Sequence, residues 1–198
     1  MSLRIVARQY PGSDRELGGV VRKVVAGGFL SFDGVAEQPN EFVTEWDDAV
    51  DENIGRVIAT QDSVLLGRRT YDEWAAFWPT SEIEPFASFI NDVDKFVATS
   101  TPLTQTWANT TVIEGSVPEF VAQLKQQPGG DIGVHGSIAL TQSLLRDGLV
   151  DELRLAIAPV LHLRGRKLFD EGVPSRLTLT RHLASPAGYL LLDLQLDG

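Results

Sequence analysis

The feature that most constrains the fold is a regular alternation of short apolar runs with longer amphipathic stretches. The apolar runs have the length of strands, and the amphipathic stretches have the period of helices. Such an alternation is typical of an α/β sheet with crossover helices. We expect strands at residues 19–30, 63–67, 95–100, 110–114 and 131–134, and helices at 42–60, 70–78, 116–127 and 137–146.

The pattern changes toward the end of the chain. The strongest strand signal spans residues 150–161, and two leucine-rich runs then alternate with polar residues at period two. Pro186-Ala187-Gly188 separates these runs, which predicts an antiparallel hairpin near 177–196. We therefore expect a three-layer α/β/α fold with a mixed, mostly parallel central sheet and a C-terminal antiparallel hairpin. No internal repeat or linker is evident, so we expect an N-terminal arm at 1–19 and a single domain at 20–198.

Composition narrows the classes of function. The 198 residues include no Cys and only three widely spaced His, so we expect neither a disulfide nor a metal site. The formal net charge of −10 argues against nucleic acid or an anionic membrane as the main partner. No apolar run is long enough to cross a bilayer, and the first residues lack the layout of a secretory signal. We expect a cytoplasmic protein whose partner is a small molecule.

Three polar or glycine-bearing segments follow predicted strands, at residues 67–70, 99–101 and 136–137. In a mostly parallel sheet the carboxyl ends of the strands form the ligand-binding edge, and two of these segments lead into helices whose free N–H groups favour an anion. Gly67 and Gly136 would let a phosphate approach the backbone. An ordinary turn explains each segment better when it is taken alone, but the three together suit a dinucleotide. The dinucleotide fingerprint G-x-G-x-x-G is absent.

The stretches LLGRRTYDEWAAFWP, KFVATSTPL and GGDIGVHGSIALTQSLLRDGLVDELRLAIAPV closely resemble the dihydrofolate reductase-like family. They look most like stand-alone relatives of the C-terminal reductase domain of the bifunctional riboflavin-biosynthesis deaminase/reductase. SFDGV at 31–35 resembles the S-x-D-G turn of that family, and RGRKLF at 164–169 resembles its late G-x-x-L-F segment. The resemblance covers the chain from about residue 20 to the C-terminus.

The resemblance implies that NADPH binds along the strand ends, and it suggests a homodimer. It places the adenosine 2′-phosphate end at the G-R-x-T turn, the adenosine half along the segment after the next strand, and the diphosphate at the glycine turn before the late helix. Two arginines at one end favour NADP over NAD on charge alone. The implied cofactor-binding residues are Gly67, Arg68, Arg69, Thr70, Thr99, Ser100, Thr101, Gly136, Ser137, Ile138 and Ala139.

Five residues are candidates for chemistry or substrate contact. Asp33, with Ser31 in the same turn, would contact the substrate, although structural capping explains Asp33 about as well. Asp51 lies 16 residues before Gly67, the separation at which true dihydrofolate reductases carry their pterin-binding acid. Alternatively, Asp51 belongs to a solvated acidic face of the predicted helix. His135 replaces part of the usual acid-Gly-Gly turn, and a buried structural role is favoured over a catalytic one. Trp46 could stack on a flat heterocycle, while core packing is the favoured alternative for it and is expected for Trp74 and Trp78.

The expected function is that of an NADPH-dependent reductase of a small heterocyclic substrate. The nearest named activity is that of 5-amino-6-(5-phosphoribosylamino)uracil reductase. Two departures from the resembling family leave the identity of the substrate open: His135 in the acid-Gly-Gly turn, and Leu163 where a glycine is common. Two alternatives stay open: a regulatory or sensing dimer that binds NADP without turnover, and a dihydrofolate reductase proper, which requires Asp51 to face the pocket.

Overall fold

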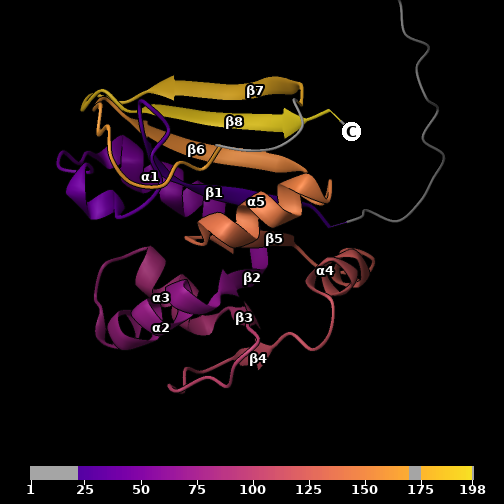
Figure 1. Ribbon diagram of the computed structural model, residues 1–198. Coiled ribbons are helices and arrows are strands. Elements are labelled where there is room, and N and C mark those ends of the chain that lie inside the picture. The colour runs from indigo at the N-terminus through magenta and orange to yellow at the C-terminus, as the bar shows by residue number, and fades with distance from the viewer. Residues whose placement is uncertain (1–21, 170–174, 198) are drawn as a thin grey trace, which may run out of the picture.

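A mixed sheet runs through the molecule in the strand order β4-β3-β2-β5-β1-β6-β8-β7 (Figure 1). The computed structural model describes residues 22–169 and 175–197, and the expected arm at 1–19 lies outside them. Neighbouring strands from β4 to β6 are parallel, while β8 runs antiparallel to β6 and to β7. The strands are β1 (Val24–Ser31), β2 (Gln61–Gly67), β3 (Asp94–Ala98), β4 (Thr110–Val112), β5 (Asp131–His135), β6 (Glu152–Ala158), β7 (Leu177–Ala184) and β8 (Leu190–Leu196).

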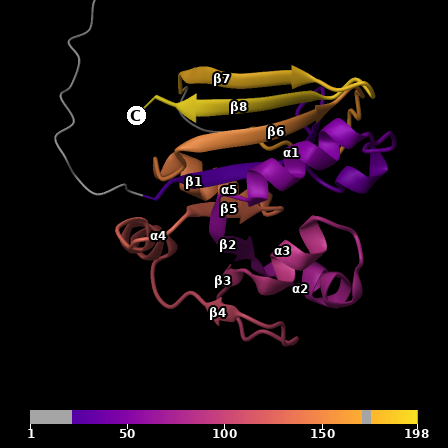
Figure 2. The same cartoon turned by 180° about the vertical axis from the view of Figure 1, so that it is seen from behind.

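Helices cover both faces of this sheet, which confirms the predicted three-layer α/β/α arrangement. One face carries α1 (Asp48–Ile58), α2 (Arg68–Phe77) and α3 (Phe86–Asp92), and Figure 2 shows them in front of the sheet. The other face carries α4 (Val117–Lys125) and α5 (Ile138–Arg146). Two short 3-10 helices, η1 (Pro39–Glu41) and η2 (Trp78–Thr80), lie in the connections.

The core is continuous on one face of the sheet and divided on the other. Under α4 and α5 a single apolar cluster joins β1, β5 and β6 to Leu140 and Leu144 of α5. On the opposite face one cluster lies under α2 and α3, and another packs around Val50 of α1 and Leu191 of β8. Between these two clusters Gly27 of β1 and Gly133 of β5 carry no side chain, and Gly27 lines the cavity described below.

Several boundaries differ from the sequence-based expectation. The helix expected at 42–60 begins at Asp48, because the Asp47 carboxylate caps it by accepting a hydrogen bond from Val50 N at 3.0 Å. The strand expected at 150–161 is shorter in the structure, where β6 spans Glu152–Ala158. The first strand, expected from residue 19, begins at Val24. Residues 19–21 of that expected strand lie outside the described residues. The predicted start of α4 is confirmed, since Ser116 Oγ accepts a hydrogen bond from Glu119 N at 3.4 Å.

The C-terminal hairpin is confirmed, and it forms one edge of the sheet. β7 pairs only with β8 in the described part of the chain, and most of its side chains are exposed. Leu177 and Leu179 are 42% and 51% exposed. No helix within the described residues is long and apolar enough to cross a membrane.

Candidate functional site

A cavity of about 930 Å³ opens over the carboxyl-terminal halves of the central strands. Its floor includes Gly27 and Gly28 of β1, and its walls come from α1, α2 and the first turn of α5. This is the edge at which open α/β sheets bind ligands. Of the residues predicted to form a site, the cavity is lined by Trp46, Asp51, Gly67, Arg68, Arg69, Thr70, His135, Gly136, Ser137, Ile138 and Ala139.

The turns that precede α2 and α5 pack directly against each other. A Cβ atom added at Gly67 would lie 2.2 Å from Ser137 Oγ. Gly136 has φ +67°, and a Cβ there would lie 2.9 Å from Thr70 Cγ2. Glycine is therefore required at both positions, for space at Gly67 and for space and backbone conformation at Gly136. The two helices consequently begin side by side.

Neither helix has its first turn capped by a side chain. Gly67 and Ser137 occupy the N-cap positions. Gly67 has no side chain, and the Ser137 hydroxyl accepts no hydrogen bond from its helix. The N–H groups of a first turn have no partner within the helix, and the helix dipole places partial positive charge there. Two such ends border one cavity, which makes this region the most favourable part of the cavity for an anion.

Arg68 connects α2 to the segment that follows β3. It donates hydrogen bonds to Asp72 Oδ2 at 2.7 Å, to Thr101 Oγ1 at 2.8 Å and to Pro102 O at 2.6 Å. Thr99, Ser100 and Thr101 do not line the cavity. The predicted segment at 99–101 therefore lies beside the segment at 67–70, but none of its own residues lines the cavity.

Arg69 lies at the rim of the cavity and is more accessible. Its side chain is 67% exposed and pairs with Glu73 at 3.1 Å and with Glu37 at 3.4 Å. The hydrogen bond to Glu73, together with the charges of both carboxylates, raises the pKa of the Arg69 guanidinium, which is therefore always charged. Because both pairs are solvent-exposed, an incoming phosphate can compete for them at small cost.

Asp33 and Ser31 do not line the cavity. The Asp33 carboxylate accepts hydrogen bonds from Ser31 Oγ at 2.9 Å, from His162 N at 2.9 Å and from Leu163 N at 3.2 Å. These bonds, that of His162 N first, hold the pKa of Asp33 below its usual range. The geometry matches the capping alternative for Asp33, which joins the 31–35 turn to the loop at 162–163.

Asp51 and Trp46 form a hydrogen-bonded pair at the cavity. Trp46 Nε1 donates to Asp51 Oδ1 at 2.9 Å, and Asp51 lies in the first turn of α1. The Trp46 ring also packs against Phe29 of β1, with ring centroids 5.5 Å apart. Asp51 thus meets the condition set for a folate-type site, namely that it faces the pocket.

His135 ends β5 and is enclosed by aromatic rings, although part of it borders the cavity. Its ring lies 5.5 Å from Phe86 and 6.4 Å from Trp74, measured between centroids, and His135 Nε2 lies 2.7 Å from Gln61 Oε1. Burial lowers the pKa of His135 to about 4, so its ring is uncharged at neutral pH. It can exchange hydrogen bonds there but carries no positive charge.

Sequence reasoning missed several residues of the cavity. Gly27 and Gly28 do not fit the dinucleotide fingerprint in spacing or context, yet both line the cavity. The available signal was a glycine pair inside an apolar strand, which often marks close approach of a ligand or another backbone. Trp74 and Trp78 were expected in the core, but they are half-buried and line the cavity together with Phe86.

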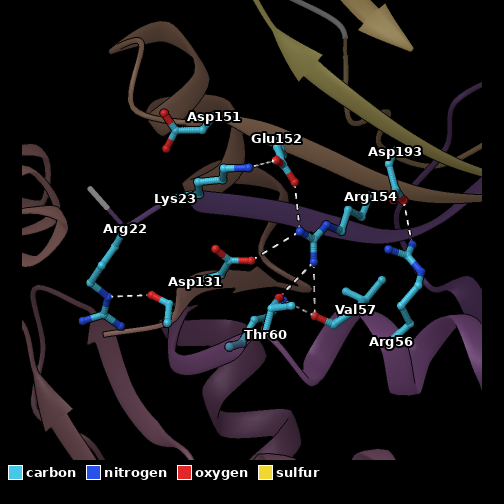
Figure 3. Close-up of polar contacts among 12 residues, drawn as sticks. Arg22, Lys23, Arg56, Val57, Thr60, Asp131, Asp151, Glu152, Arg154 and Asp193 are labelled. Atoms are coloured by element: carbon cyan, nitrogen blue, oxygen red, sulfur yellow. Dashed lines mark hydrogen bonds and ion pairs between the residues drawn. The ribbon is translucent and has the colours of Figure 1, made fainter. Parts of the chain in front are cut away.

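Arg154 of β6 also lines the cavity, although no sequence motif predicted it as a site residue. Figure 3 shows its guanidinium between β6 and the end of α1. It donates to Glu152 Oε2 at 2.9 Å, Asp131 Oδ2 at 3.3 Å, Thr60 Oγ1 at 3.1 Å and Val57 O at 3.4 Å. Its charge is therefore balanced by two carboxylates. Among the residues described, no cluster of His, Asp and Glu could hold a metal ion.

Comparison with known proteins supports the architecture. A candidate riboflavin biosynthesis protein from Shewanella sp. PV-4 superposes with a TM-score of 0.73 at 16% identity, covering 89% of this chain and 99% of that one. A pyrimidine reductase-like protein from Corynebacterium diphtheriae NCTC gives 0.64 at 15% identity, covering 89% and 92%. A diaminohydroxyphosphoribosylaminopyrimidine deaminase/5-amino-6-(5-phosphoribosylamino)uracil reductase from Thermotoga maritima gives 0.64 at 13% identity, but the match spans only 57% of that longer protein and 89% of this one.

Two sequence relatives come from Bacillus subtilis (strain 168), and both are uncharacterized. YyaP is 31% identical over 122 residues, a match that spans 60% of this chain and 64% of YyaP. YwjB is 27% identical over 153 residues, spanning 76% of this chain and 84% of YwjB.

The sheet order and the flanking helices define a three-layer α/β/α domain, and these solved structures share that fold. The sequence also identifies the family. The family model for the RibD C-terminal domain matches residues 22–191, so the chain belongs to the RibD C-terminal domain family. The resemblance seen in the sequence is thereby confirmed.

Proposed function

We propose that this protein is an NADPH-dependent reductase of a small heterocyclic substrate. The observation that carries the proposal is the pair of uncapped helix N-termini, α2 and α5, which begin side by side at the cavity. Backbone N–H groups and two aligned helix dipoles suit a diphosphate. Membership of a family named for a riboflavin-pathway protein supports an oxidoreductase role.

The residues present fit the cofactor. Gly136 and Ser137 would hold the diphosphate, because side chains there are absent or small and the first turn of α5 is uncapped. Arg69 would bind the 2′-phosphate at the rim. Arg68 holds the segment after β3 through its hydrogen bond to Thr101 and would itself border the adenosine half. Gly28 leaves space open at the floor, since a Cβ added there would meet no atom within 4 Å.

When bound, NADPH supplies a hydride that adds to the carbon of a polarised C=N or C=O bond of the substrate, and a proton goes to the nitrogen or oxygen. Asp51 lines the cavity and would orient a substrate N–H group, and Trp46 donates a hydrogen bond to the Asp51 carboxylate. Reduction of the ribosyl group of a substituted pyrimidine, as in the 5-amino-6-(5-phosphoribosylamino)uracil reductase step, is the nearest named activity. The position of Asp51 at the cavity keeps a folate-type reductase as a second candidate.

Nucleotide titration followed by tryptophan fluorescence tests the cofactor assignment. We expect saturable NADPH binding with a Kd at least about tenfold lower than that of NADH, because Arg69 pairs with the 2′-phosphate. Arg69→Ala should remove most of this preference and leave the Kd of NADH almost unchanged. Arg146→Ala, in the last turn of α5 away from the cavity, is the matched control. Equal losses for both nucleotides in Arg69→Ala would contradict the 2′-phosphate assignment.

Single-turnover oxidation of NADPH against pyrimidines and pterins tests catalysis. Oxidation by one member of the panel would support the reductase proposal. Tight NADPH binding without oxidation by any member would favour the alternative of a sensing or regulatory dimer.

We also propose that the protein is a homodimer. The cytoplasmic location expected from the cysteine-free composition stays a prediction.

A further inference from the structure

One buried polar side chain of the cavity has no part in the proposed cofactor site. Asn53 lies in α1, is only 9% exposed, and lines the cavity. Its amide group has an oxygen that accepts hydrogen bonds and an NH₂ group that donates two. A buried polar group without a partner costs free energy, so the hydrogen bonds of Asn53 show which of its two groups is left for a ligand.

The amide oxygen of Asn53 is already engaged. Its Oδ1 atom accepts hydrogen bonds from Arg56 Nη2 and from Arg181 Nη1, each at 3.0 Å. A guanidinium group can only donate, so the oxygen has to face the two arginines and the amide cannot be turned round. The Nδ2 group is thereby fixed on the other branch of the amide.

The two arginines also strengthen Asn53 as a donor. Arg56 Nη2 donates to Asp193 Oδ1 of β8 at 2.8 Å, which holds it in place (Figure 3). Arg181 comes from β7 and makes no ion pair with any residue that the structure describes. Two positive groups therefore contact the amide oxygen, and a single carboxylate balances one of them. This charge polarises the amide and makes its N–H groups better donors.

The Nδ2 group of Asn53 is free to meet a ligand. It has no hydrogen-bond partner within the described part of the chain, and protein atoms do not enclose it. Phe29, Ile54 and Ala156, which also line the cavity and pack together beside α1, have no side-chain acceptor to offer. A molecule in the cavity therefore has to supply the acceptor.

Asn53 lies apart from the turns that would hold the diphosphate. Those turns follow β2 and β5, whereas Arg181, which contacts Asn53, belongs to β7. In the sheet β1, β6 and β8 separate β5 from β7, a span of about 19 Å at the usual spacing of neighbouring strands. An arginine side chain covers only part of that span, so Asn53 lies toward the β6 and β8 side of the cavity.

We infer that Asn53 is a specificity-determining residue whose Nδ2 group donates a hydrogen bond to a ring carbonyl oxygen of the substrate. The inference rests on the proposed reductase function, because it assigns this side of the cavity to the substrate. The substrate class is then a heterocycle with an oxo group at the position that meets Asn53. An amino group at that position would set donor against donor and would be rejected.

Two fluorescent probes and one substitution test the inference by anisotropy. Pterin has a single ring carbonyl, and 2,4-diaminopteridine carries an amino group in its place. Asn53→Asp keeps one oxygen toward the two arginines and replaces only the Nδ2 group, by a second oxygen. The new charge faces two guanidinium groups, so the variant should fold, which cooperative thermal unfolding checks. Each probe is titrated with and without NADP⁺.

We expect pterin to bind wild-type protein saturably. In Asn53→Asp the ratio of the two dissociation constants should shift at least about tenfold toward the diamino compound. Because the ratio is compared between variants, the contribution of Asp51 to either probe cancels. Asn40→Asp adds the same charge at an exposed asparagine that also lines the cavity, and it should keep the wild-type ratio.

Three results would overturn the inference: no binding of pterin to wild-type protein, an unchanged ratio in Asn53→Asp, or an equal shift in Asn40→Asp. Titration with NADP⁺ separates it from the cofactor assignment. We expect the NADP⁺ affinity of Asn53→Asp to be almost unchanged. A loss as large as that of pterin would mean that Asn53 contacts the cofactor, which would overturn the inference and leave the reductase proposal standing. A protein that shows the pterin shift but binds no NADP⁺ would contradict the proposed function and leave the role of Asn53 supported.

Discussion

At the scale of single residues, His135 shows how burial decides what a candidate side chain can do. The fold places its imidazole among Trp74, Phe86 and Phe89. The ring and its bond to Gln61 form part of the cavity wall. The residue chosen from the sequence as a catalytic candidate therefore lies at the cavity, but its environment keeps it neutral.

That environment predicts a specific pH dependence of stability. Because the pKa of His135 is about 4 in the folded protein and near 6.5 when unfolded, protons bind the unfolded state more readily between these values. The free energy of unfolding should fall by about 1–3 kcal/mol as the pH falls from 6.5 to 4, and the slope from His135 should vanish only above about pH 7.5, where the unfolded imidazole is also uncharged. Urea unfolding across this range should show a weaker dependence in His135→Asn. His182→Asn, at an exposed position on β7, should keep the wild-type slope, and identical slopes in wild type and His135→Asn would contradict the assignment.

At the scale of secondary-structure elements, the contact between the turns before α2 and α5 organises the cofactor end. Gly67→Ala would place a methyl group 2.2 Å from Ser137 Oγ, so the helices would have to separate. We expect a stability loss of about 1–3 kcal/mol and at least about tenfold weaker NADPH binding. Gly67→Ala combined with Ser137→Gly should recover part of both losses.

A glycine of α1 provides the control for that experiment. A Cβ added at Gly55 would meet only Pro85 Cγ, at an ordinary 3.7 Å. Gly55→Ala should therefore be neutral or slightly stabilising, because alanine favours the helix. Thermal unfolding and NADPH titration of the three variants measure both effects. A Gly67→Ala protein with wild-type affinity would show that the contact between the turns does not shape the site.

The elements themselves were largely predictable, because strand-length apolar runs and glycine turns are local signals. The segment 42–47 was not, since contacts from far along the chain fix it: Ala187 N donates to Asp47, and the Tyr189 hydroxyl donates to Glu45 O at 2.8 Å. The glycine turns of the site could be predicted because they depend on backbone geometry. The roles of Asp33 and Thr99 could not, because their surroundings depend on how separate loops meet.

At the scale of the whole molecule, the exposed β7 edge of the sheet is the surface through which we expect two chains to associate. β7 is an eight-residue edge strand with exposed leucines, and such strands pair readily with a second chain. We expect sedimentation to show a dimer at micromolar concentration, and Leu179→Glu to dissociate it. Val112→Glu, a similarly exposed apolar position on β4 at the opposite edge, should leave the dimer intact. A wild-type protein that sediments only as a monomer would contradict the homodimer proposal.

The structure of the complex with NADP⁺ tests the placement of the cofactor most directly. The diphosphate should accept hydrogen bonds from backbone N–H groups of the first turn of α5, beside the start of α2, and the 2′-phosphate should contact Arg69. A nucleotide bound elsewhere, or bound with its diphosphate away from the first turn of α5, would contradict the proposed site and the reductase function built on it.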